Sequence, residues 1–512
     1  MAGADEYDVI VVGAGHNALT CAGYLARAGV RVLVLEGRED VGGDTATEEL
    51  TLPGWLHDTC SSAHVVIQSN PLIARDELDL VSSYGLRYLV TDPAVVVPLD
   101  DDDSLVVHPD PARTADELGR FSARDARALL TLLEEWESGL RVAHAHHQAG
   151  LDLSDRDLAR RYERLRARSA WEVVHETFEH EAVRQALMWL SFATIQPPRR
   201  PGTGALPAAI ISGRIRSGWT TPVGGSRALP DALVRQIRAH RGDVKCDAWI
   251  ERFLVDGGRC VGVETRDGRR YRARRAVVSS AHVVTLDRAL DGVSTAVAAA
   301  AARWRPGLSV FAVHFALSAH PTYPHATGRR PAVAGALGSP AGLDRQVAAA
   351  LEGRVDLSDP WILIVDSTLV DPGRAPGAVL KFLTIAPELH EGRPWDDAAT
   401  ARYAERLLDL ARQRVAGLDD AHILARRAES PTSIAAHNLA NLGGSCHGGE
   451  FHLDDGSIEP GWRDVRTDVA GLYLTGSTTH PGGSVSGRPG RNSARVVLED
   501  LGIDPSGVMS TP

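Results

Sequence analysis

The sequence has few lysines, few cysteines and few aromatic residues, and these shortages exclude several classes of protein. Only Lys245 and Lys381 are lysines among the 55 basic residues, and 66 Asp and Glu leave a net charge of −11 over 512 residues. A chain this acidic disfavours a nucleic-acid partner. The five cysteines are odd in number and form no C-x-x-C pair, which argues against a disulfide framework and a zinc ribbon. We therefore expect no metal site.

The chain also lacks a secretory signal and an apolar run of membrane length. It begins MAGADEYD, which is acidic and polar, and no hydrophobic stretch approaches the length of a bilayer span. These absences predict a cytoplasmic protein. The arginine-rich segment 154–168 has apolar residues at helical spacing. It is either a solvated helix packed along one stripe or a peripheral contact with an anionic membrane.

The first informative unit is a strand, a glycine turn, a helix and a second strand. The apolar run Tyr7–Val12 predicts a buried strand, the small residues of Ala18–Ala28 predict a helix, and Val30–Leu35 predicts the second strand. Gly13 allows a tight turn, and Gly15 lets the backbone approach a pyrophosphate. The start of the helix then offers free N–H groups and partial positive charge to that anion.

An acidic residue and a paired glycine follow this unit. Glu36 ends the second strand, where a carboxylate can accept hydrogen bonds from ribose hydroxyls, and an acid there disfavours NADP. Ala18 takes the third position of the G-x-G-x-x-G pattern, which needs only close packing of helix on strand. Gly42 and Gly43 open the backbone again just before Asp44. The whole pattern predicts a Rossmann-type dinucleotide site.

Two later blocks carry similar signals. In the middle of the chain, a predicted helix over 228–240 precedes Trp249 and Ile250, and a predicted strand over Ala276–Ser279 leads into Ser280. Near the C-terminus, a predicted strand over 471–474 leads into a glycine-rich stretch, and a helix is expected from about residue 490 to 501. Glycines in that stretch leave the backbone open to a flat ring.

Together these blocks resemble the flavoprotein superfamily that contains amine oxidases and phytoene desaturases. The C-terminal Leu-Tyr-Leu-x-Gly-x-x-x-His-Pro-Gly-Gly is similar to the closing FAD motif of that family. The stretch Thr47–Trp55 is similar to the branch containing the mammalian pyridine nucleotide-disulphide oxidoreductase domain 2 protein. Many members carry Arg after the paired glycine, where this chain has Asp44. The resemblance implies that FAD is the cofactor and that it contacts Gly13, Gly15, His16, Asn17, Ala18, Glu36, Gly37, Arg38, Gly42, Gly43, Asp44, Trp249, Ile250, Ser280, Gly476, Ser477, Gly483, Ser484 and Val485.

The resemblance also implies an α/β fold of two interleaved domains. A Rossmann-type FAD-binding domain with a parallel sheet would take residues 1–85, 216–300 and 431–512. A substrate domain of mixed sheet and helices (α+β) would take residues 86–215 and 301–430. No second G-x-G-x-x-G follows a strand, and the cysteines suggest no redox pair, so the electron acceptor must reach the flavin directly. Oxygen and a quinone both stay open as that acceptor.

Three local predictions concern the substrate domain. Two apolar runs, 94–98 and 105–107, predict a hairpin whose turn contains the acidic residues 100–103. Thr114 and the acids after it predict the start of a helix in capping-box style. A further helix is expected over 121–140, with Ser122 as a candidate cap.

Two residues are candidates for catalysis. His480 lies in the loop that the family places beside the flavin ring, where an imidazole can take a proton or clamp the substrate. Its alternative role is structural, as a brace for the glycine loop. Lys381 lies in a predicted strand, Val379–Ile385, and related amine oxidases use a lysine that is bonded through water to flavin N5. A purely structural role is the alternative for Lys381 too.

A second group of reactive side chains lies in one loop. His57, Asp58, Cys60 and His64 have types that bind metals, but their spacing fits no standard site. Covalent attachment of the flavin through Cys60 or a histidine is a further alternative that we do not favour.

The leading functional hypothesis is an FAD-dependent oxidoreductase acting on a small molecule. It would desaturate, dehydrogenate or isomerise an apolar or mixed substrate by hydride transfer to flavin N5. The alternative is an amine or amino-acid oxidase that forms an imine, which the low aromatic content of 5% weakens because such enzymes often place an aromatic pair at the flavin. A flavin-binding protein without turnover is a second alternative.

Overall fold

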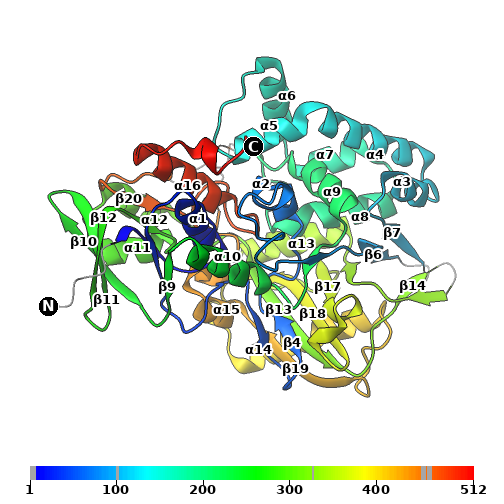
Figure 1. Ribbon diagram of the computed structural model, residues 1–512. Helices are drawn as coiled ribbons and strands as arrows, with labels where there is room; N and C mark the ends of the chain where they lie inside the picture. Colours follow the sequence, from blue (N-terminus) through cyan, green and yellow to red (C-terminus); the bar gives the residue numbers. More distant parts are fainter. Residues whose placement is uncertain (1–6, 100–102, 326–327, 451–456, 458–463, 512) are drawn as a thin grey trace.

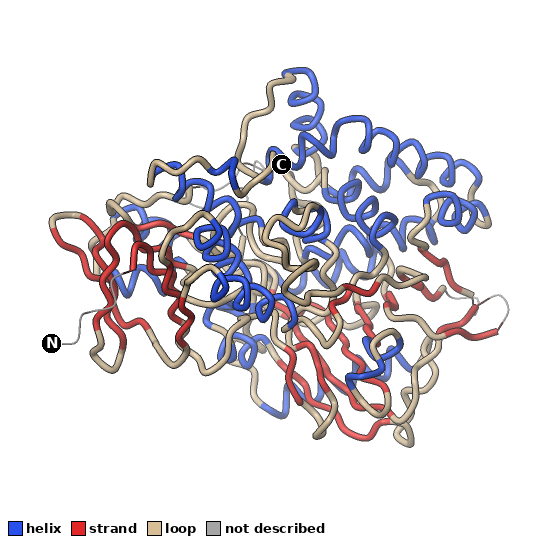
Figure 2. The backbone as a smooth tube through the Cα atoms, viewed as in Figure 1, coloured by secondary structure: helices blue, strands red, loops and turns tan. Residues whose placement is uncertain are grey.

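The structure, a computed structural model, is built around two large sheets with helices on their faces (Figures 1 and 2). It describes residues 7–99, 103–325, 328–450, 457 and 464–511. Within those residues each large sheet has seven strands, and the strands of each come from distant parts of the chain. In Figure 1 the first sheet lies at the left and the second at the lower right. This architecture confirms the predicted α/β class.

The first sheet has a parallel core that positions the glycine turn. β1 is flanked by β2 and β12, both parallel to it, while β9 and β20 extend the parallel part at the two sides. The first half of β12 instead joins an antiparallel meander with β11 and β10. The strands are β1 (Tyr7–Val12), β2 (Val32–Leu35), β9 (Asp243–Lys245), β10 (Ile250–Asp256), β11 (Arg259–Thr265), β12 (Arg270–Ser279) and β20 (Leu472–Leu474).

Both faces of this sheet are covered around its central strands, and β1 and β2 accordingly form nearly continuous apolar runs rather than an alternating pattern. Val9 and Val11 of β1 pack under α1 (His16–Arg27), α10 (Ala228–Ala239) and α16 (Arg488–Asp500). Ile10 and Val12 pack on the opposite face, together with residues of α11 (Val283–Leu290) and α12 (Thr295–Arg303). The α1 helix begins four residues after β1 ends, so the glycine turn lies between the end of this strand and the start of the helix.

The second sheet is mostly antiparallel and carries the remaining large cores. One face packs against α8 (Glu181–Ser191), α9 (Leu206–Ser217) and α13 (Pro340–Leu351), and the other packs against α14 (Asp397–Arg412). Tyr403 and Leu407 of α14 belong to the same core as Phe311 and Phe382 of the sheet. Its strands, in spatial order, are β19 (Ile423–Glu429), β13 (Ser309–Leu317), β18 (Ala378–Ala386), β17 (Ile362–Asp366), β16 (Ala334–Leu337), β6 (Val95–Pro98) and β7 (Ser104–Val107).

The remaining strands and α-helices are three small strand pairs and seven further helices in the part of the chain that is described. The small strand pairs are β3 (Thr47–Glu49) with β4 (Leu56–Asp58), β5 (Tyr88–Leu89) with β8 (Thr221–Pro222), and β14 (Tyr323–His325) with β15 (Gly328–Arg330). The other helices are α2 (Pro71–Ala74), α3 (Pro111–Gly119), α4 (Ala123–Glu135), α5 (Arg141–Gln148), α6 (Arg156–Arg166), α7 (Ala170–Thr177) and α15 (Pro431–His437).

The local predictions have mixed outcomes. The hairpin is confirmed, since β6 and β7 pair antiparallel, although the predicted turn residues 100–102 lie outside the described residues. Ser122 caps α4 by accepting a hydrogen bond from the Asp125 N–H. The prediction for Thr114 is wrong: α3 begins at Pro111 with Asp110 as its cap, and Thr114 lies inside the helix with its hydroxyl bonded to the backbone of His108. Proline at the first helical position starts the helix early.

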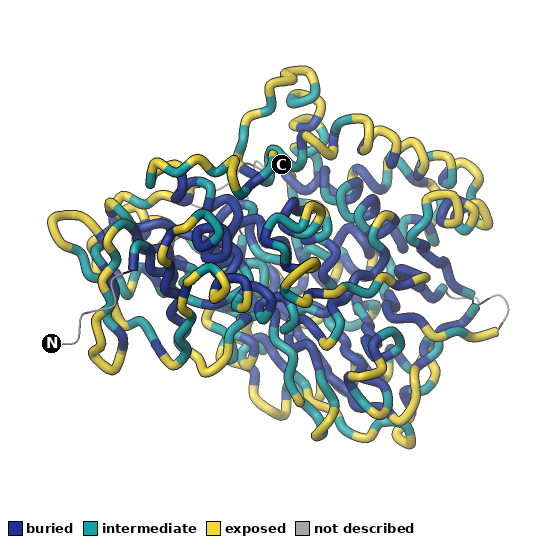
Figure 3. The backbone as a smooth tube through the Cα atoms, in the orientation of Figure 1, coloured by how far each residue is buried: buried dark blue, intermediate teal, exposed yellow. Residues whose placement is uncertain are grey.

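The arginine-rich segment forms α6, which projects from the top of the molecule and is largely exposed (Figure 3). Its apolar stripe is packed, because Tyr162 is buried and Leu158 and Leu165 lie against the small core of Trp136 and Leu140. The membrane contact stays a prediction. Over the part of the chain that is described, every helix is too short or too polar to cross a bilayer.

Candidate functional site

A cavity of about 210 Å³ opens where β1 ends and α1 begins. It lies at the carboxyl ends of parallel strands, where α/β sheets usually bind ligands. Fifteen of the nineteen residues expected to contact FAD line it: Gly13, Gly15, His16, Asn17, Ala18, Glu36, Gly37, Arg38, Gly43, Asp44, Trp249, Ile250, Ser280, Gly476 and Ser477. Three blocks that are far apart in the sequence therefore meet at one cavity.

The glycine turn has the backbone that its sequence predicts. Gly13 has φ +89°, and a Cβ there would collide with the side chain of Ser280, so both conformation and contact require glycine. A Cβ on Gly15 would meet nothing within 4 Å among the described residues. The space above Gly15 is therefore free for a ligand to approach the backbone.

Polar groups around this space fit the diphosphate and ribose of FAD. Gly15 is the N-terminal cap of α1, and no side chain of the described residues caps this helix end with a hydrogen bond. The first N–H groups of the helix are therefore available to an anion. The Oδ1 atom of Asn17 is buried with no hydrogen-bond partner in the described part of the chain. Glu36 lines the cavity and accepts hydrogen bonds from the N–H groups of Ala14 (2.7 Å) and Arg38 (3.0 Å).

Four residues expected to contact FAD lie outside this cavity. The Gly42 N–H donates to the Ala14 carbonyl at 2.8 Å and so fixes the glycine turn. Gly483 and Ser484 line a second cavity, and Val485 is buried in the core beneath α1 and α16. The Ser484 carbonyl lies 3.2 Å from Nε2 of His16, which connects this segment to the first cavity.

An asparagine pair at the first cavity could not be foreseen from the sequence. Asn438 and Asn441 each donate to Oδ1 of Asp44 at 2.8 Å, from positions almost 400 residues further along the chain. Burial raises the pKa of Asp44, in opposition to these hydrogen bonds. Asp44 thus occupies the place of the family's arginine as a partly buried acceptor held by two amides.

The second cavity is larger, at about 470 Å³. Its walls come from α5, α6 and α9 on one side and from the segment 480–488 on the other. His480 lines it and is only 5% exposed. Its Nε2 lies 2.7 Å from the His147 carbonyl, which can only accept, so Nε2 carries a hydrogen and the lone pair of the neutral ring lies on Nδ1.

Apart from Tyr162, the ionisable side chains that line this second cavity are all basic. Among the described residues that line it, five are arginines, four are histidines and none is Asp or Glu. Burial lowers the pKa of His144 to about 3, so this ring is neutral near pH 7. Its Nδ1 lies 2.9 Å from the hydroxyl of Tyr162.

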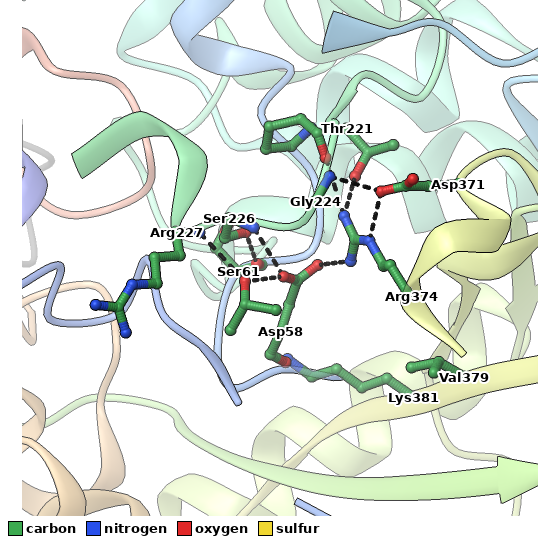
Figure 4. Close-up of polar contacts among 12 residues, drawn as sticks. Asp58, Ser61, Thr221, Gly224, Ser226, Arg227, Asp371, Arg374, Val379 and Lys381 are labelled. Carbon is green, nitrogen blue, oxygen red and sulfur yellow. Dashed lines mark hydrogen bonds and ion pairs between the residues drawn. The ribbon is translucent and has the colours of Figure 1, made fainter. Parts of the chain in front are cut away.

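Lys381 lies away from both cavities, in a polar cluster between the two sheets (Figure 4). It is 5% exposed, and its Nζ donates to the backbone carbonyls of Asp58 (3.3 Å), Thr59 (3.2 Å) and Cys60. β18 is confirmed as its strand. These contacts indicate that Lys381 holds the turn after β4 against the second sheet.

Arg374 is the centre of the same cluster. It binds Oδ2 of Asp58 at 2.7 Å and Oδ2 of Asp371 at 2.9 Å, with its own side chain 1% exposed. It also donates to the Pro222 carbonyl. Burial opposes ionisation of Asp58, but the charge of Arg374 and a hydrogen bond from the Ser226 N–H outweigh it and hold the pKa of Asp58 below its usual value.

The reactive residues of the 57–64 loop are therefore separated into different contacts. His57 bonds to Thr51 Oγ1 at 2.8 Å, whereas His64 lies between Ser226 Oγ and the Tyr88 hydroxyl. Burial lowers the pKa of both rings to about 3. In the described part of the chain, no three His, Cys, Asp or Glu residues come together as a metal site.

Folding also brings together two cysteines that the sequence separates. The thiols of Cys60 and Cys446 lie close enough to influence each other's ionisation, and Cys446 Sγ lies 3.1 Å from Nδ1 of His447. The neighbouring Cys60 thiol and His447 lower the pKa of Cys446. Spacing carried no signal for this pair, because it depends on long-range folding.

Comparisons with known proteins agree with this geometry. The family described as "Flavin containing amine oxidoreductase" matches residues 19–498. The chain is 26% identical to the mouse "Pyridine nucleotide-disulfide oxidoreductase domain-containing protein 2", over 97% of this chain and 94% of that one. It is also 26% identical to the lycopene-forming phytoene desaturase of Pseudescherichia vulneris, over 96% and 99%. Among solved structures, a triple mutant of putrescine oxidase superposes with a TM-score of 0.61 at 16% identity, over 97% of this chain and 99% of that one.

Proposed function

Because the chain belongs to the flavin-containing amine oxidoreductase family and is an oxidoreductase with FAD as its cofactor, we propose that it dehydrogenates or desaturates a small apolar or mixed molecule. The hydride would pass from a saturated carbon to flavin N5, and isomerisation of a double bond is a variant of the same chemistry. FAD supplies the two-electron acceptor, and the protein supplies binding, orientation and proton transfer.

One observation carries this proposal: the two cavities share one segment of chain. Ser477 lines the smaller cavity, while His480 and Ser484 line the larger one. His16 lines the smaller cavity and contacts the Ser484 carbonyl. A cofactor held at the glycine turn and a substrate held in the larger cavity would therefore meet along residues 477–484.

His480 is the residue that we assign to proton transfer. Its ring lines the larger cavity and is oriented by the Nε2 hydrogen bond to His147, which leaves Nδ1 as the basic atom. A histidine in such a position can accept the proton that leaves the carbon next to the hydride donor. Lys381 is not assigned a step, since backbone carbonyls of residues 58–60 surround its Nζ.

The charge of the larger cavity favours carbon–carbon over carbon–nitrogen oxidation. A cationic amine would gain from a carboxylate, and the described lining contains none. One of the relatives reported above is a desaturase by name. An amine or amino-acid oxidase is the second candidate, supported by the fold shared with putrescine oxidase. For either reaction we propose that oxygen or a quinone reoxidises the flavin.

Anaerobic flavin bleaching separates these candidates. Purified holoenzyme is mixed without oxygen with a panel of alkyl acids, alcohols, cyclic terpenes and primary amines, and the loss of the oxidised flavin band is followed in a single turnover. Bleaching by a nitrogen-free member supports dehydrogenation. Bleaching confined to amines supports the second candidate. If no member bleaches the flavin, although dithionite reduces it under the same conditions, the result supports a protein without turnover.

A further inference from the structure

Arg488 is a buried cation for which the described residues provide no counter-ion. It is the first residue of α16, which begins two residues earlier than its sequence predicts, and it is 6% exposed. Its side chain lines the larger cavity. Among the described residues, its guanidinium donates only to the carbonyl and hydroxyl of Ser69, at 3.4 and 3.2 Å, and its Nε is buried with no partner there.

The neighbouring arginine on the same helix shows the usual arrangement. Arg491 binds both carboxylate oxygens of Glu77, at 2.8 and 2.9 Å. Within the described residues, no carboxylate lies within ion-pair distance of Arg488. Burial and the nearby Arg491 lower the pKa of Arg488 to about 10, so it still carries its charge near pH 7. A buried charge without a partner is strongly unfavourable, and proteins rarely keep one unless a ligand pairs with it.

The groups that face Arg488 across the cavity do not neutralise it. His144 is neutral, and its Nδ1 is bonded to the Tyr162 hydroxyl. At the rim, Arg141 and Arg216 share one acid, Glu137, and Arg75 is exposed with no ion pair in the described chain. Positive potential in a partly closed apolar cavity attracts an anion.

We propose that Arg488 binds the anionic end of the substrate, and that the substrate is an amphipathic acid. A carboxylate is the anion that matches a planar guanidinium through two parallel hydrogen bonds. The apolar remainder would lie along Val65, Ala205 and Ala209 of the same cavity. Arg488 and His480 both line the larger cavity from the segment 480–488, so the anion site and the proposed base belong to one wall. This inference rests on the proposed function, since it names the substrate class of that active site.

The test compares ligands that differ only in charge. Octanoate, octanamide and octylamine are titrated into holoenzyme, and binding is measured by calorimetry, which requires no turnover. Octanoate is expected to bind about 10–100-fold more tightly than octanamide, the range for a charge-assisted hydrogen-bond pair. Arg488→Met should remove this preference, and Arg488→Lys should retain part of it. Arg495→Met, on the same helix but ion-paired to Glu499, is the matched control and should keep it.

Two results would overturn the inference. The first is equal binding of octanoate and octanamide by the wild type. The second is an Arg488→Met variant that keeps the preference for octanoate. The same conclusion would follow if this variant changed the flavin reduction potential and weakened the binding of all three ligands equally, because Arg488 would then act on the flavin. Failure of the proposed function looks different: charge-selective binding would persist, but no ligand of the acid class would bleach the flavin.

Discussion

Two buried arginines of this protein differ in whether carboxylates surround them. Arg374 is surrounded by acceptors, with carboxylates of Asp58 and Asp371 at 2.7 and 2.9 Å. Arg488 is similarly buried but faces a cavity, and its described hydrogen-bond acceptors are the carbonyl and hydroxyl of Ser69. The first forms a closed network between segments that are far apart in the sequence. The second keeps hydrogen-bonding capacity for something that is not part of the chain.

The difference separates structural from functional polar groups. In the cluster around Arg374, Lys381 and Asp58 have their partners within the protein, and neither lines the smaller or the larger cavity. Along the cavity walls, Asn17 and Arg488 have buried polar atoms without partners in the described chain. Substitutions in the closed cluster should therefore change stability, and substitutions on the cavity walls should change binding or rate.

The largest effect is expected for Asp58→Asn. Removing one partner of a buried ion pair leaves Arg374 under-compensated and should lower the free energy of unfolding by about 3–5 kcal/mol. Denaturant unfolding measures the change. Asp157→Asn, which breaks the exposed pair with Arg160, is the control and should cost less than about 1 kcal/mol. Equal effects of the two substitutions would contradict the closed network.

The same pair predicts a dependence on pH. The pKa of folded Asp58 is held below the ordinary aspartate value of 3.8. Its stabilising contribution is therefore fully present above that pH and is lost as the pH falls through the lower, folded value. Wild-type unfolding free energy should fall on acidification below about pH 4, and Asp58→Asn should flatten this part of the curve. An unchanged slope in the variant would exclude Asp58 as its source.

Substitution of His480 should change the rate of flavin reduction, whereas substitution of Lys381 should change the stability of the fold. His480→Ala should keep FAD and fold but slow anaerobic flavin bleaching by about 10²–10⁴-fold, the range for a lost general base. Lys381→Met should lower stability by about 1–3 kcal/mol, because it leaves buried carbonyls unpaired. Rapid-mixing absorbance and thermal melting report the two effects. Normal bleaching in a fully loaded His480→Ala would remove it from the mechanism, and a collapse of bleaching in a stable, loaded Lys381→Met would assign Lys381 to the flavin.

Glu36→Ala should weaken FAD binding by about 1.5–3 kcal/mol, the value of hydrogen bonds to a charged acceptor. The carboxylate lines the smaller cavity, so the effect should be on cofactor affinity, measured by titrating FAD into apoprotein. Glu36→Gln keeps one acceptor oxygen and should lose less. Unchanged affinity in Glu36→Ala would mean that the acid only fixes the N–H groups of Ala14 and Arg38.

The smallest effect, and the one of opposite sign, is expected for Arg488→Met. Replacing an unpaired buried charge by an apolar side chain of similar length should raise the stability of the substrate-free protein by about 0.5–2 kcal/mol. Thermal melting without ligand measures it. A clear loss of stability would show that Arg488 already has a structural counter-ion.

Much of the cofactor cavity could be predicted from the sequence, because its signals are local. Gly13, Gly15 and Glu36 lie in one strand–turn–helix–strand unit, where spacing along the chain determines spacing in the fold. The partners of Asp44 could not be foreseen, since Asn438 and Asn441 reach it only through long-range folding.

The larger cavity was less accessible to sequence reasoning for the same reason. Its walls combine α5, α6 and α9 with the C-terminal segment, so the burial of Arg488 cannot be read from its neighbours in the chain. The helix boundary was also misplaced, because proline at 489 allows α16 to begin at Arg488. The limits of the two domains, at residues 85, 215, 300 and 430, stay predictions.

The most direct test of the whole interpretation is the FAD content of Gly15→Val. A Cβ at position 15 meets nothing within 4 Å in the described protein, so the variant should fold, but its side chain would enter the space assigned to the pyrophosphate. The wild type should carry one FAD per chain, released on denaturation, and Gly15→Val should be folded and colourless. Gly507→Val, where a Cβ likewise meets nothing within 4 Å of the described chain, should stay yellow. A Gly15→Val variant that binds FAD as fully as the wild type would contradict the placement of the cofactor.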